Sequence, residues 1–129
     1  MWALCIWREA RGTGREGMLA VGWVMMNRLA TKRWGLTMLD VVTARLQFSS
    51  MTAPGDSQTI IWPNTHCSPA DLAAWRVAQD VVDLVIGAPS ANDPTKGATF
   101  YFADTIDKPE WADSMRLVAT IGNQEFFTV

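Results

Sequence analysis

The sequence predicts an α+β fold that is mainly helical, with a small antiparallel β-sheet toward the C-terminus. Four segments with helical signals precede residue 87, and three strand-like runs follow residue 97. Helices first and strands last is the order typical of α+β domains. The chain has 129 residues, 49% of them hydrophobic, and no linker or repeat. We therefore predict a single domain, residues 1–129, with its own core.

The first two helices are predicted over residues 2–11 and 16–30, and Gly12 is placed to end the first. The second contains "MLAVGWVMMNRL", which is apolar on nearly all sides and is typical of a buried central helix. Gly22 lies inside this run. Because a glycine within a helix costs about 1 kcal/mol, we expect another helix to approach closely there.

Two more helices begin at N-cap signals, in which a Thr or Ser precedes an Asp by three residues. They are predicted over residues 37–46 and 68–86, with Gly87 and Pro89 ending the second. Residues 47–67 between them are rich in Ser, Thr, Pro, Asn and Gly and are predicted to be a long loop. Loops of this length are uncommon in compact domains and are often functional.

Three strands are predicted from runs of aromatic and β-branched residues. The runs are "ATFYFA" (98–103), "MRLVATI" (115–121) and "EFFTV" (125–129). The letters "GNQ" between the last two are typical of a hairpin turn. Alternation along the first run predicts that Phe100 and Phe102 face the core and that Tyr101 lies on the opposite face.

Composition and charge argue against nucleic-acid and membrane partners. The 11 basic and 13 acidic residues give a net charge of −2 and form no basic stripe. No apolar run approaches the length that spans a bilayer. Residues 1–8 lack the basic leader and cleavage site of a signal peptide. We expect a monomer that has no signal peptide and binds neither nucleic acid nor membranes.

The cysteine and histidine content leaves little room for a metal site. A zinc hydrolase usually needs three protein ligands of His, Cys or carboxylate type, and His66 is the one histidine. We therefore expect no metal and no cofactor. Cys5 is expected to be a small buried apolar residue that is not joined to Cys67.

Glu9 is the most informative residue of "CIWREARGTGREG", residues 5–17. Helical spacing puts it on one stripe with three apolar residues, Trp2, Cys5 and Ile6. A carboxyl group on an apolar face loses hydration, which favours its protonated form. A protonated carboxyl group can protonate a leaving group, as the cleavage of a glycosidic bond requires.

The alternative is a solvated glutamate that ends the helix and pairs with Arg8, Arg11 or Arg15. Arg8 and Arg11 lie off the apolar stripe, so we expect both to be exposed to water. Spacing alone leaves both interpretations of Glu9 open.

Several short motifs occur in an order that resembles one family of enzymes. They are "EARG" (9–12), Gly17, "AVGWVMMNRL" (20–29), "QFS" (47–49), "GATFYF" (97–102), Trp111 and "IGNQEFF" (121–127). On these motifs the chain resembles the SleB-like cell-wall hydrolases, a family that includes the catalytic domain of spore-cortex-lytic enzymes and phage endolysins. The resemblance covers nearly the whole chain and implies a domain like those of lysozymes and lytic transglycosylases.

The resemblance implies cleavage of peptidoglycan glycan strands between N-acetylmuramic acid and N-acetylglucosamine, with Glu9 as general acid and base. The implied outcome is lytic transglycosylation, which yields an anhydro-muropeptide. Glu9 would protonate the departing oxygen and then take the proton of the sugar's own C6 hydroxyl, so no second carboxylate is needed. The alternatives are a muramidase that hydrolyses the same bond, an amidase that cuts the sugar–peptide bond, and a glycan-binding domain without activity.

Two departures from the family pattern concern the ends of the chain. Gln124 stands where the family usually has a basic residue. The chain also begins almost directly on the catalytic helix, without a separate wall-binding module. We interpret this as a phage endolysin, which is expected to wait in the host cytoplasm until it is released to the cell wall.

The other motifs contain polar residues that are candidates for substrate binding. Asn27 and Arg28 have two interpretations. In one, they form a polar cap at the end of the second helix, with Arg28 at the negative end of its dipole. In the other, Asn27 reaches toward Glu9 or an acetamido group. Gln47 and Ser49 are predicted to bond the sugar, because Phe48 between them is expected to be a core anchor.

Aromatic residues supply the remaining candidates. Tyr101 is expected to face the cleft, where its hydroxyl can bond substrate. Trp62 and Trp111 lie beside prolines in predicted loops, where each either stacks on a sugar or covers a core. The predicted substrate-binding residues are Asn27, Gln47, Ser49, Tyr101 and Trp111.

Overall fold

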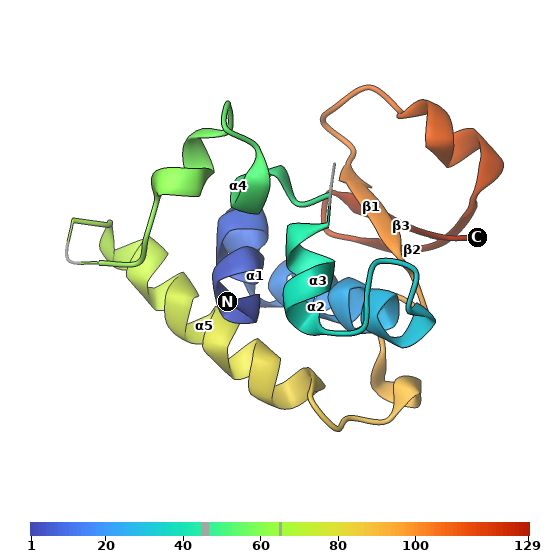
Figure 1. Ribbon diagram of the computed structural model, residues 1–129, viewed down its shortest axis with the longest axis horizontal. Helices are drawn as coiled ribbons and strands as arrows, with labels where there is room; N and C mark the ends of the chain where they lie inside the picture. The colour runs from blue at the N-terminus through green and yellow to red at the C-terminus, as the bar shows by residue number, and fades with distance from the viewer. Residues whose placement is uncertain (45–46, 65) are drawn as a thin grey trace.

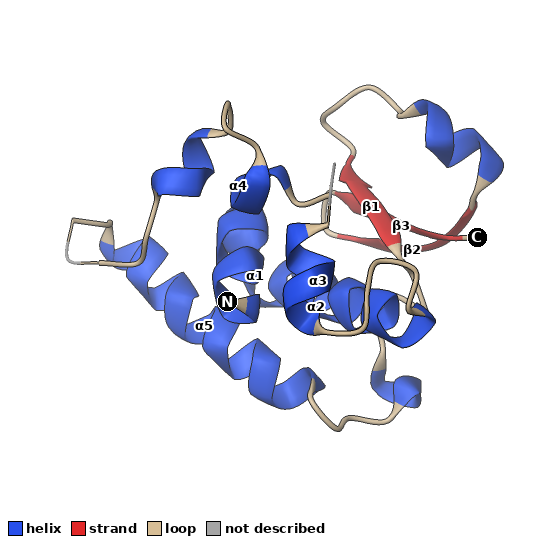
Figure 2. Ribbon diagram, viewed as in Figure 1, coloured by secondary structure: helices blue, strands red, loops and turns tan. Residues whose placement is uncertain are grey.

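The computed structural model describes residues 1–44, 47–64 and 66–129, and it confirms the α+β class (Figure 1). The described helices and strands are α1 (Trp2–Ala10), α2 (Gly14–Thr31), α3 (Met38–Thr43), α4 (Ser49–Thr52), α5 (Pro69–Val85), β1 (Phe100–Ala103), β2 (Arg116–Ile121) and β3 (Gln124–Thr128). Figure 2 shows the longer helices gathered on one side of the molecule and the strands on the other.

Helix α1 lies inside the helical part, where it contacts α2, α3, α4 and α5. Cys5, Ile6 and Trp7 are fully buried. The Trp7 indole Nε1 donates a hydrogen bond to the backbone oxygen of Asp71, at the start of α5, over 2.8 Å. Cys5 and Ile6 of the predicted apolar stripe are therefore buried, but so are Leu4, Trp7 and Ala10 outside it. Glu9 follows one turn after Cys5 and is partly buried.

The prediction that Arg8 and Arg11 are exposed to water is wrong. Arg8 is 7% exposed, and its guanidinium donates to the backbone oxygens of Ser50, Thr59 and Ile61. The Arg11 side chain is 19% exposed. The residues that cover Arg8 are more than 40 positions away in the chain, so the helical pattern of residues 2–11 cannot reveal them.

Gly22 of α2 faces α5, which confirms the expected close approach. A Cβ atom on Gly22 would lie 2.8 Å from Val81 Cγ1 and 3.4 Å from Ile6 Cδ1. Val81 is fully buried in α5 and is β-branched, so it has little freedom to move away. Glycine is therefore the residue that lets α2 and α5 pack at this distance.

Gly22→Ala should destabilise the protein by about 1–2 kcal/mol, although alanine favours helix formation by about 1 kcal/mol. The cost comes from overpacking against Val81. Urea unfolding would measure the change. Gly55→Ala is the matched control, because a Cβ atom there meets nothing within 4 Å, and it should stay within about 0.5 kcal/mol of the unmodified protein. Equal stability of the two variants would contradict the close approach.

Both predicted N-caps are confirmed. Thr37 Oγ1 accepts a hydrogen bond from the Asp40 backbone N–H over 3.2 Å, and the Asp40 carboxylate accepts one from the Thr37 N–H over 3.1 Å. Ser68 Oγ likewise accepts from the N–H of Asp71 at the start of α5. Helix α3 ends at Thr43, earlier than predicted, and residues 45–46 of that prediction lie outside the described residues.

The segment predicted to be a long loop contains two short helical turns, α4 and a 3₁₀ turn at Ser57–Ile60. Asp56 connects them. Its Oδ1 accepts from the Gln58 backbone N–H over 2.8 Å, and its Oδ2 accepts from Ser49 Oγ over 2.7 Å. Such side-chain bonds close turns locally without apolar periodicity, which is why the pattern of the sequence did not predict them.

The three predicted strands form one antiparallel sheet in the order β1-β3-β2, with β3 in the centre. Tyr101 of β1 is paired with Phe126 of β3, and their rings stack with centroids 5.7 Å apart. This face packs on α2, because Phe126 clusters with Ala20 and Val24. The opposite face holds Phe102 in a second small cluster. The alternation predicted for β1 is confirmed, but the face assignment is only partly right. Phe102 is buried and Phe100 only partly so, and Tyr101 is on the face directed toward the helices.

Cys5 and Cys67 are both free thiols. Cys5 lies in the main core, and the Cys67 thiol donates to the backbone oxygen of Trp62 over 3.2 Å. In the part of the chain that the structure describes, no helix combines the length and the apolar character needed to cross a membrane.

Candidate active site

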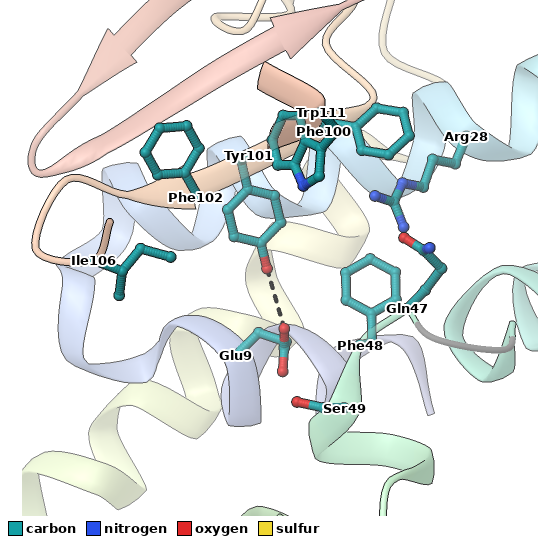
Figure 3. A pocket seen from close by; sticks show the side chains of 10 residues that line it. All are labelled: Glu9, Arg28, Gln47, Phe48, Ser49, Phe100, Tyr101, Phe102, Ile106 and Trp111. Carbon is teal, nitrogen blue, oxygen red and sulfur yellow. Dashed lines mark hydrogen bonds between the residues drawn. The ribbon is translucent and has the colours of Figure 1, made fainter. Parts of the chain in front are cut away.

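A cavity of about 430 Å³ lies between the helical part and the sheet (Figure 3). Segments from four parts of the chain supply its walls. The lining residues are Glu9 of α1, Arg28 of α2, Gln47, Phe48 and Ser49 at the start of α4, Phe100, Tyr101 and Phe102 of β1, Ile106, and Trp111. Aromatic rings predominate, and Glu9 is the one carboxylate among the described residues that line the cavity.

Glu9 and Tyr101 meet across this cavity. The Tyr101 hydroxyl donates a hydrogen bond to Glu9 Oε1 over 3.2 Å (Figure 3). The alternative in which Glu9 pairs with an arginine is not observed, because neither ion pair found among the described residues involves it. A carboxyl group held by a neutral donor beside an open cavity can give a proton to a bound ligand or take one from it.

The pKa of Tyr101 is raised well above its usual value of 10, mainly by burial and then by the charge of Glu9. The unfolded chain therefore loses this proton near pH 10 while the folded protein still holds it, so the free energy of unfolding falls as the pH rises further. Urea unfolding measures the free energy of unfolding at about pH 9 and about pH 11. Between these two pH values it should fall further for the unmodified protein than for Tyr101→Phe. Tyr101 is the one tyrosine of the chain. Equal losses in the two proteins would contradict this coupling.

Arg28 forms the far end of the cavity and was not predicted as a site residue. It is 4% exposed, and its Nε donates to the backbone oxygen of Thr99 over 2.6 Å. The rings of Trp34, Phe48 and Phe100 lie 4.7 to 5.1 Å from its guanidinium carbon. Burial lowers the pKa of Arg28 from its usual range to about 10, so the group remains a cation at neutral pH. The one sequence signal for it was its place beside Asn27 in the "NR" pair.

A second cavity, also of about 430 Å³, adjoins Glu9 and has a different character. Arg8, Glu9, Arg11, Gly12, Gln58 and Asp71 line it. Asp71 Oδ1 lies 3.6 Å from Arg11 Nε. Glu9 therefore stands between an aromatic cavity and a charged one.

The structure brings most of the predicted substrate-binding residues to the aromatic cavity. Gln47, Ser49, Tyr101 and Trp111 line it together with Glu9. Asn27 does not line it, and its amide Nδ2 instead donates to Asp93 Oδ2 and to the Ala98 backbone oxygen. The Asn27 amide is thus bonded to the segment that leads into β1, and neither the polar cap nor the expected reach toward Glu9 is observed. Contact of these residues with a ligand stays a prediction.

The tryptophans and Phe48 occupy distinct places. Phe48 is buried in the main core, as expected of an anchor, and its ring also lines the aromatic cavity. Trp111 packs against Phe100, Phe102 and Phe127 and has one side on the cavity. Trp62 is 56% exposed and lies under the Arg8 guanidinium. Trp111 therefore both covers a core cluster and offers a ring to a ligand.

Within residues 1–44, 47–64 and 66–129, no three or more His, Cys, Asp or Glu side chains come together as they would to hold a metal ion.

Comparison with known proteins found one family model, one curated relative and two solved structures that resemble this chain. The family model described as Cell Wall Hydrolase matches residues 12–127, beginning three residues after Glu9. The spore cortex-lytic enzyme of Halalkalibacterium halodurans is 28% identical over 126 residues, which are 98% of this chain and 33% of that protein. The chain thus spans about a third of the length of this curated relative.

Two solved structures share the fold. The catalytic domain of Bacillus cereus SleB superposes with a TM-score of 0.70 at 24% identity and covers 98% of this chain and 86% of that one. The catalytic domain of the germination-specific lytic transglycosylase SleB from Bacillus anthracis gives a TM-score of 0.71 at 24% identity, with coverage of 98% and 90%.

Proposed function

This chain belongs to the Cell Wall Hydrolase family, whose model matches residues 12–127, and on that premise we propose that it cleaves the glycan strands of bacterial peptidoglycan. The bond proposed is the one between N-acetylmuramic acid and N-acetylglucosamine. Glu9 is proposed as the general acid and base, and lytic transglycosylation as the reaction. The name of the Bacillus anthracis relative, a lytic transglycosylase, supports this choice.

The observation that carries the proposal is the pairing of Glu9 with Tyr101 in an aromatic cavity. Sugar rings bind well to aromatic faces. Besides Tyr101, four aromatic residues line the cavity: Phe48, Phe100, Phe102 and Trp111. A glycosidic bond needs an acid at the leaving oxygen. Glu9 is the carboxyl group that the described lining residues offer there.

The proposed reaction moves two protons through Glu9, one given up and one taken. Glu9 gives its proton to the oxygen of the departing sugar, and the bond to the anomeric carbon breaks. The resulting carboxylate then takes the proton of the C6 hydroxyl of the N-acetylmuramic acid that carries this anomeric carbon. The C6 oxygen attacks the anomeric carbon and closes the anhydro ring. Tyr101 holds Oε1 by its hydroxyl, which leaves the second oxygen of Glu9 free for the proton.

A muramidase is the second candidate, and Asp71 is the observation in its favour. Hydrolysis with two carboxyl groups requires a second carboxylate that activates water or attacks the sugar. Asp71 lines the charged cavity together with Glu9. Its carboxylate is near Arg11 and its side chain is 41% exposed, which suits an ion pair as well as a base.

Mass spectrometry of digested peptidoglycan tests the proposal. We expect anhydro-muropeptides as the main products, with Asp71→Asn retaining more than about a tenth of the activity because a base at Asp71 would contribute at least 10²-fold. Muropeptides with reducing ends, together with a loss of that size in Asp71→Asn, would favour the muramidase. Freed stem peptides would show an amidase, and an intact wall would contradict the proposed function altogether.

The biological setting is proposed from the resemblance alone. We propose a phage endolysin that acts as a monomer and stays in the host cytoplasm until it reaches the wall. Lysis of cells from outside by the purified protein, and from inside when it is produced with a pore-forming protein but not without one, would test this role.

A further inference from the structure

The Arg28 guanidinium is a buried cation at one end of the aromatic cavity, and part of its hydrogen-bonding capacity is unused. Nε is bonded to the Thr99 backbone oxygen, whereas Nη1 is buried and has no hydrogen-bond partner among the described residues. Neither ion pair found among the described residues includes Arg28. Figure 3 shows the group directed into the cavity beside Gln47 and Phe48.

This arrangement is unfavourable for the protein on its own. A buried donor without an acceptor is destabilising, and more so when the group is charged. The aromatic faces of Trp34, Phe48 and Phe100 offset part of this cost, because they attract a cation that lies over them. They cannot accept the in-plane N–H of Nη1 as an oxygen would. An unused donor in a cavity beside a catalytic candidate therefore indicates a ligand oxygen.

We propose that Arg28 recognises the N-acetyl group of an amino sugar bound in the aromatic cavity. This inference rests on the proposed function and names a specificity-determining residue for it. An acetamido group combines a carbonyl oxygen with a methyl group. The oxygen would accept a hydrogen bond from Nη1, and the methyl would pack against the rings of Phe48 and Phe100, so one small group uses both features of this end of the cavity.

A carboxylate of the stem peptide is the competing ligand for a buried cation. It would use the charge of Arg28 but not the apolar rings around it, because a carboxylate carries no methyl group. The surroundings of Arg28 are mostly aromatic, and the charged groups near Glu9 lie in the other cavity instead. The chemistry of this end of the aromatic cavity therefore favours the neutral acetamido group.

Binding of soluble oligosaccharides tests the proposal without any cleavage. The Glu9→Gln protein is titrated in a calorimeter with a tetramer of N-acetylglucosamine and with the same tetramer after removal of its acetyl groups. The titration is run at about pH 9, where most of the sugar amines are uncharged. We expect a preference of about tenfold or more for the acetylated tetramer, as one charge-assisted hydrogen bond would give. Adding Arg28→Met should reduce this preference to about twofold or less, while Arg28→Lys should retain an intermediate preference.

Arg33→Met is the matched control. The Arg33 guanidinium carbon lies 5.1 Å from the centroid of the Trp34 ring, compared with 4.7 Å for Arg28. Unlike Arg28, Arg33 is exposed and is not among the residues that line the cavity. It should leave the preference unchanged. Thermal unfolding of each variant checks that it is folded. If Arg28→Met fails to fold, two other measurements test the proposal. They are the preference for the acetylated tetramer in the protein with Arg28 intact, and the decrease of that preference in Arg28→Lys. Absence of either would contradict it.

Three results would overturn the inference. One is equal affinity for the two tetramers, or no binding of either, while Arg28 is present. Another is a preference that survives in the folded Arg28→Met protein. The third is that Arg28→Met weakens binding of glycan strands that carry stem peptides but not of peptide-free strands. Arg28 would then bind a carboxylate of the stem peptide. Failure of the proposed function would appear elsewhere, as a wall that the unmodified protein leaves intact.

Discussion

Glu9→Gln should reduce the release of muropeptides from peptidoglycan by at least 10² to 10⁴-fold, the range typical of a positioned acid or base. The amide cannot give up a proton to the leaving oxygen or accept one afterwards. Its carbonyl oxygen can still accept the hydrogen bond of the Tyr101 hydroxyl, which Glu9 Oε1 accepts over 3.2 Å in the structure. The fold should therefore change little, and the loss should be chemical rather than structural.

Glu16→Gln is the control for this substitution. Glu16 is an exposed residue in the first turn of α2, in the same region of the chain. Glu16→Gln should keep the activity within about twofold, and the free energy of unfolding within about 0.5 kcal/mol, of the unmodified protein. Turnover of purified peptidoglycan, followed by mass spectrometry, and thermal unfolding give the two measurements. Near-normal release of anhydro-muropeptides by a folded Glu9→Gln protein would remove Glu9 from the mechanism.

Arg8→Met should destabilise the protein by about 3 kcal/mol or more and lower its activity as well. Three charge-assisted hydrogen bonds join Arg8 to the backbone oxygens of Ser50, Thr59 and Ile61, over 3.0 to 3.2 Å. Each such bond contributes about 1.5–3 kcal/mol, although contributions within one cluster do not simply add. Without the guanidinium these oxygens, one buried and two partly buried, lose their donor, and α4 and the 3₁₀ turn after it are freed from α1.

The loss of activity follows from the place of these turns in the site. The segment that Arg8 holds includes Ser49 of the aromatic cavity and Gln58 of the charged one. Arg15→Met is the control, because Arg15 is an exposed arginine at the start of α2. Urea unfolding, and activity at a temperature where both variants are folded, should separate them clearly. Equal stability of Arg8→Met and Arg15→Met would show that the three bonds have little net effect.

Local spacing was sufficient to predict the two groups that meet at the centre of the site. Helical spacing put Glu9 on the buried stripe of α1, and strand alternation put Tyr101 on the face of β1 opposite Phe102. Both patterns depend on neighbours within one element, where backbone geometry dictates which side chains share a face. The N-caps at Thr37 and Ser68 were predictable for the same reason, because a cap and its partner are three residues apart.

The family motifs added information that spacing could not supply. They led to the resemblance to SleB-like cell-wall hydrolases, which the match of the Cell Wall Hydrolase model over residues 12–127 confirms. The same motifs included "QFS" and Trp111, which the structure brings to the cavity of Glu9. They also suggested Asn27, whose amide is bonded outside that cavity, to Asp93 and the Ala98 backbone.

The two arginines show where prediction from the sequence ended. Arg8 and Arg28 both looked like polar residues at the surface of a helix, and both are buried. Arg8 is covered by residues 50–62, and Arg28 by Trp34, Phe48 and the start of β1. Helical spacing describes which residues share a face but not which distant segment packs there. That choice depends on contacts formed between parts of the chain that lie far apart, so the covered cations and the cavity between the helices and the sheet emerge when the chain is folded.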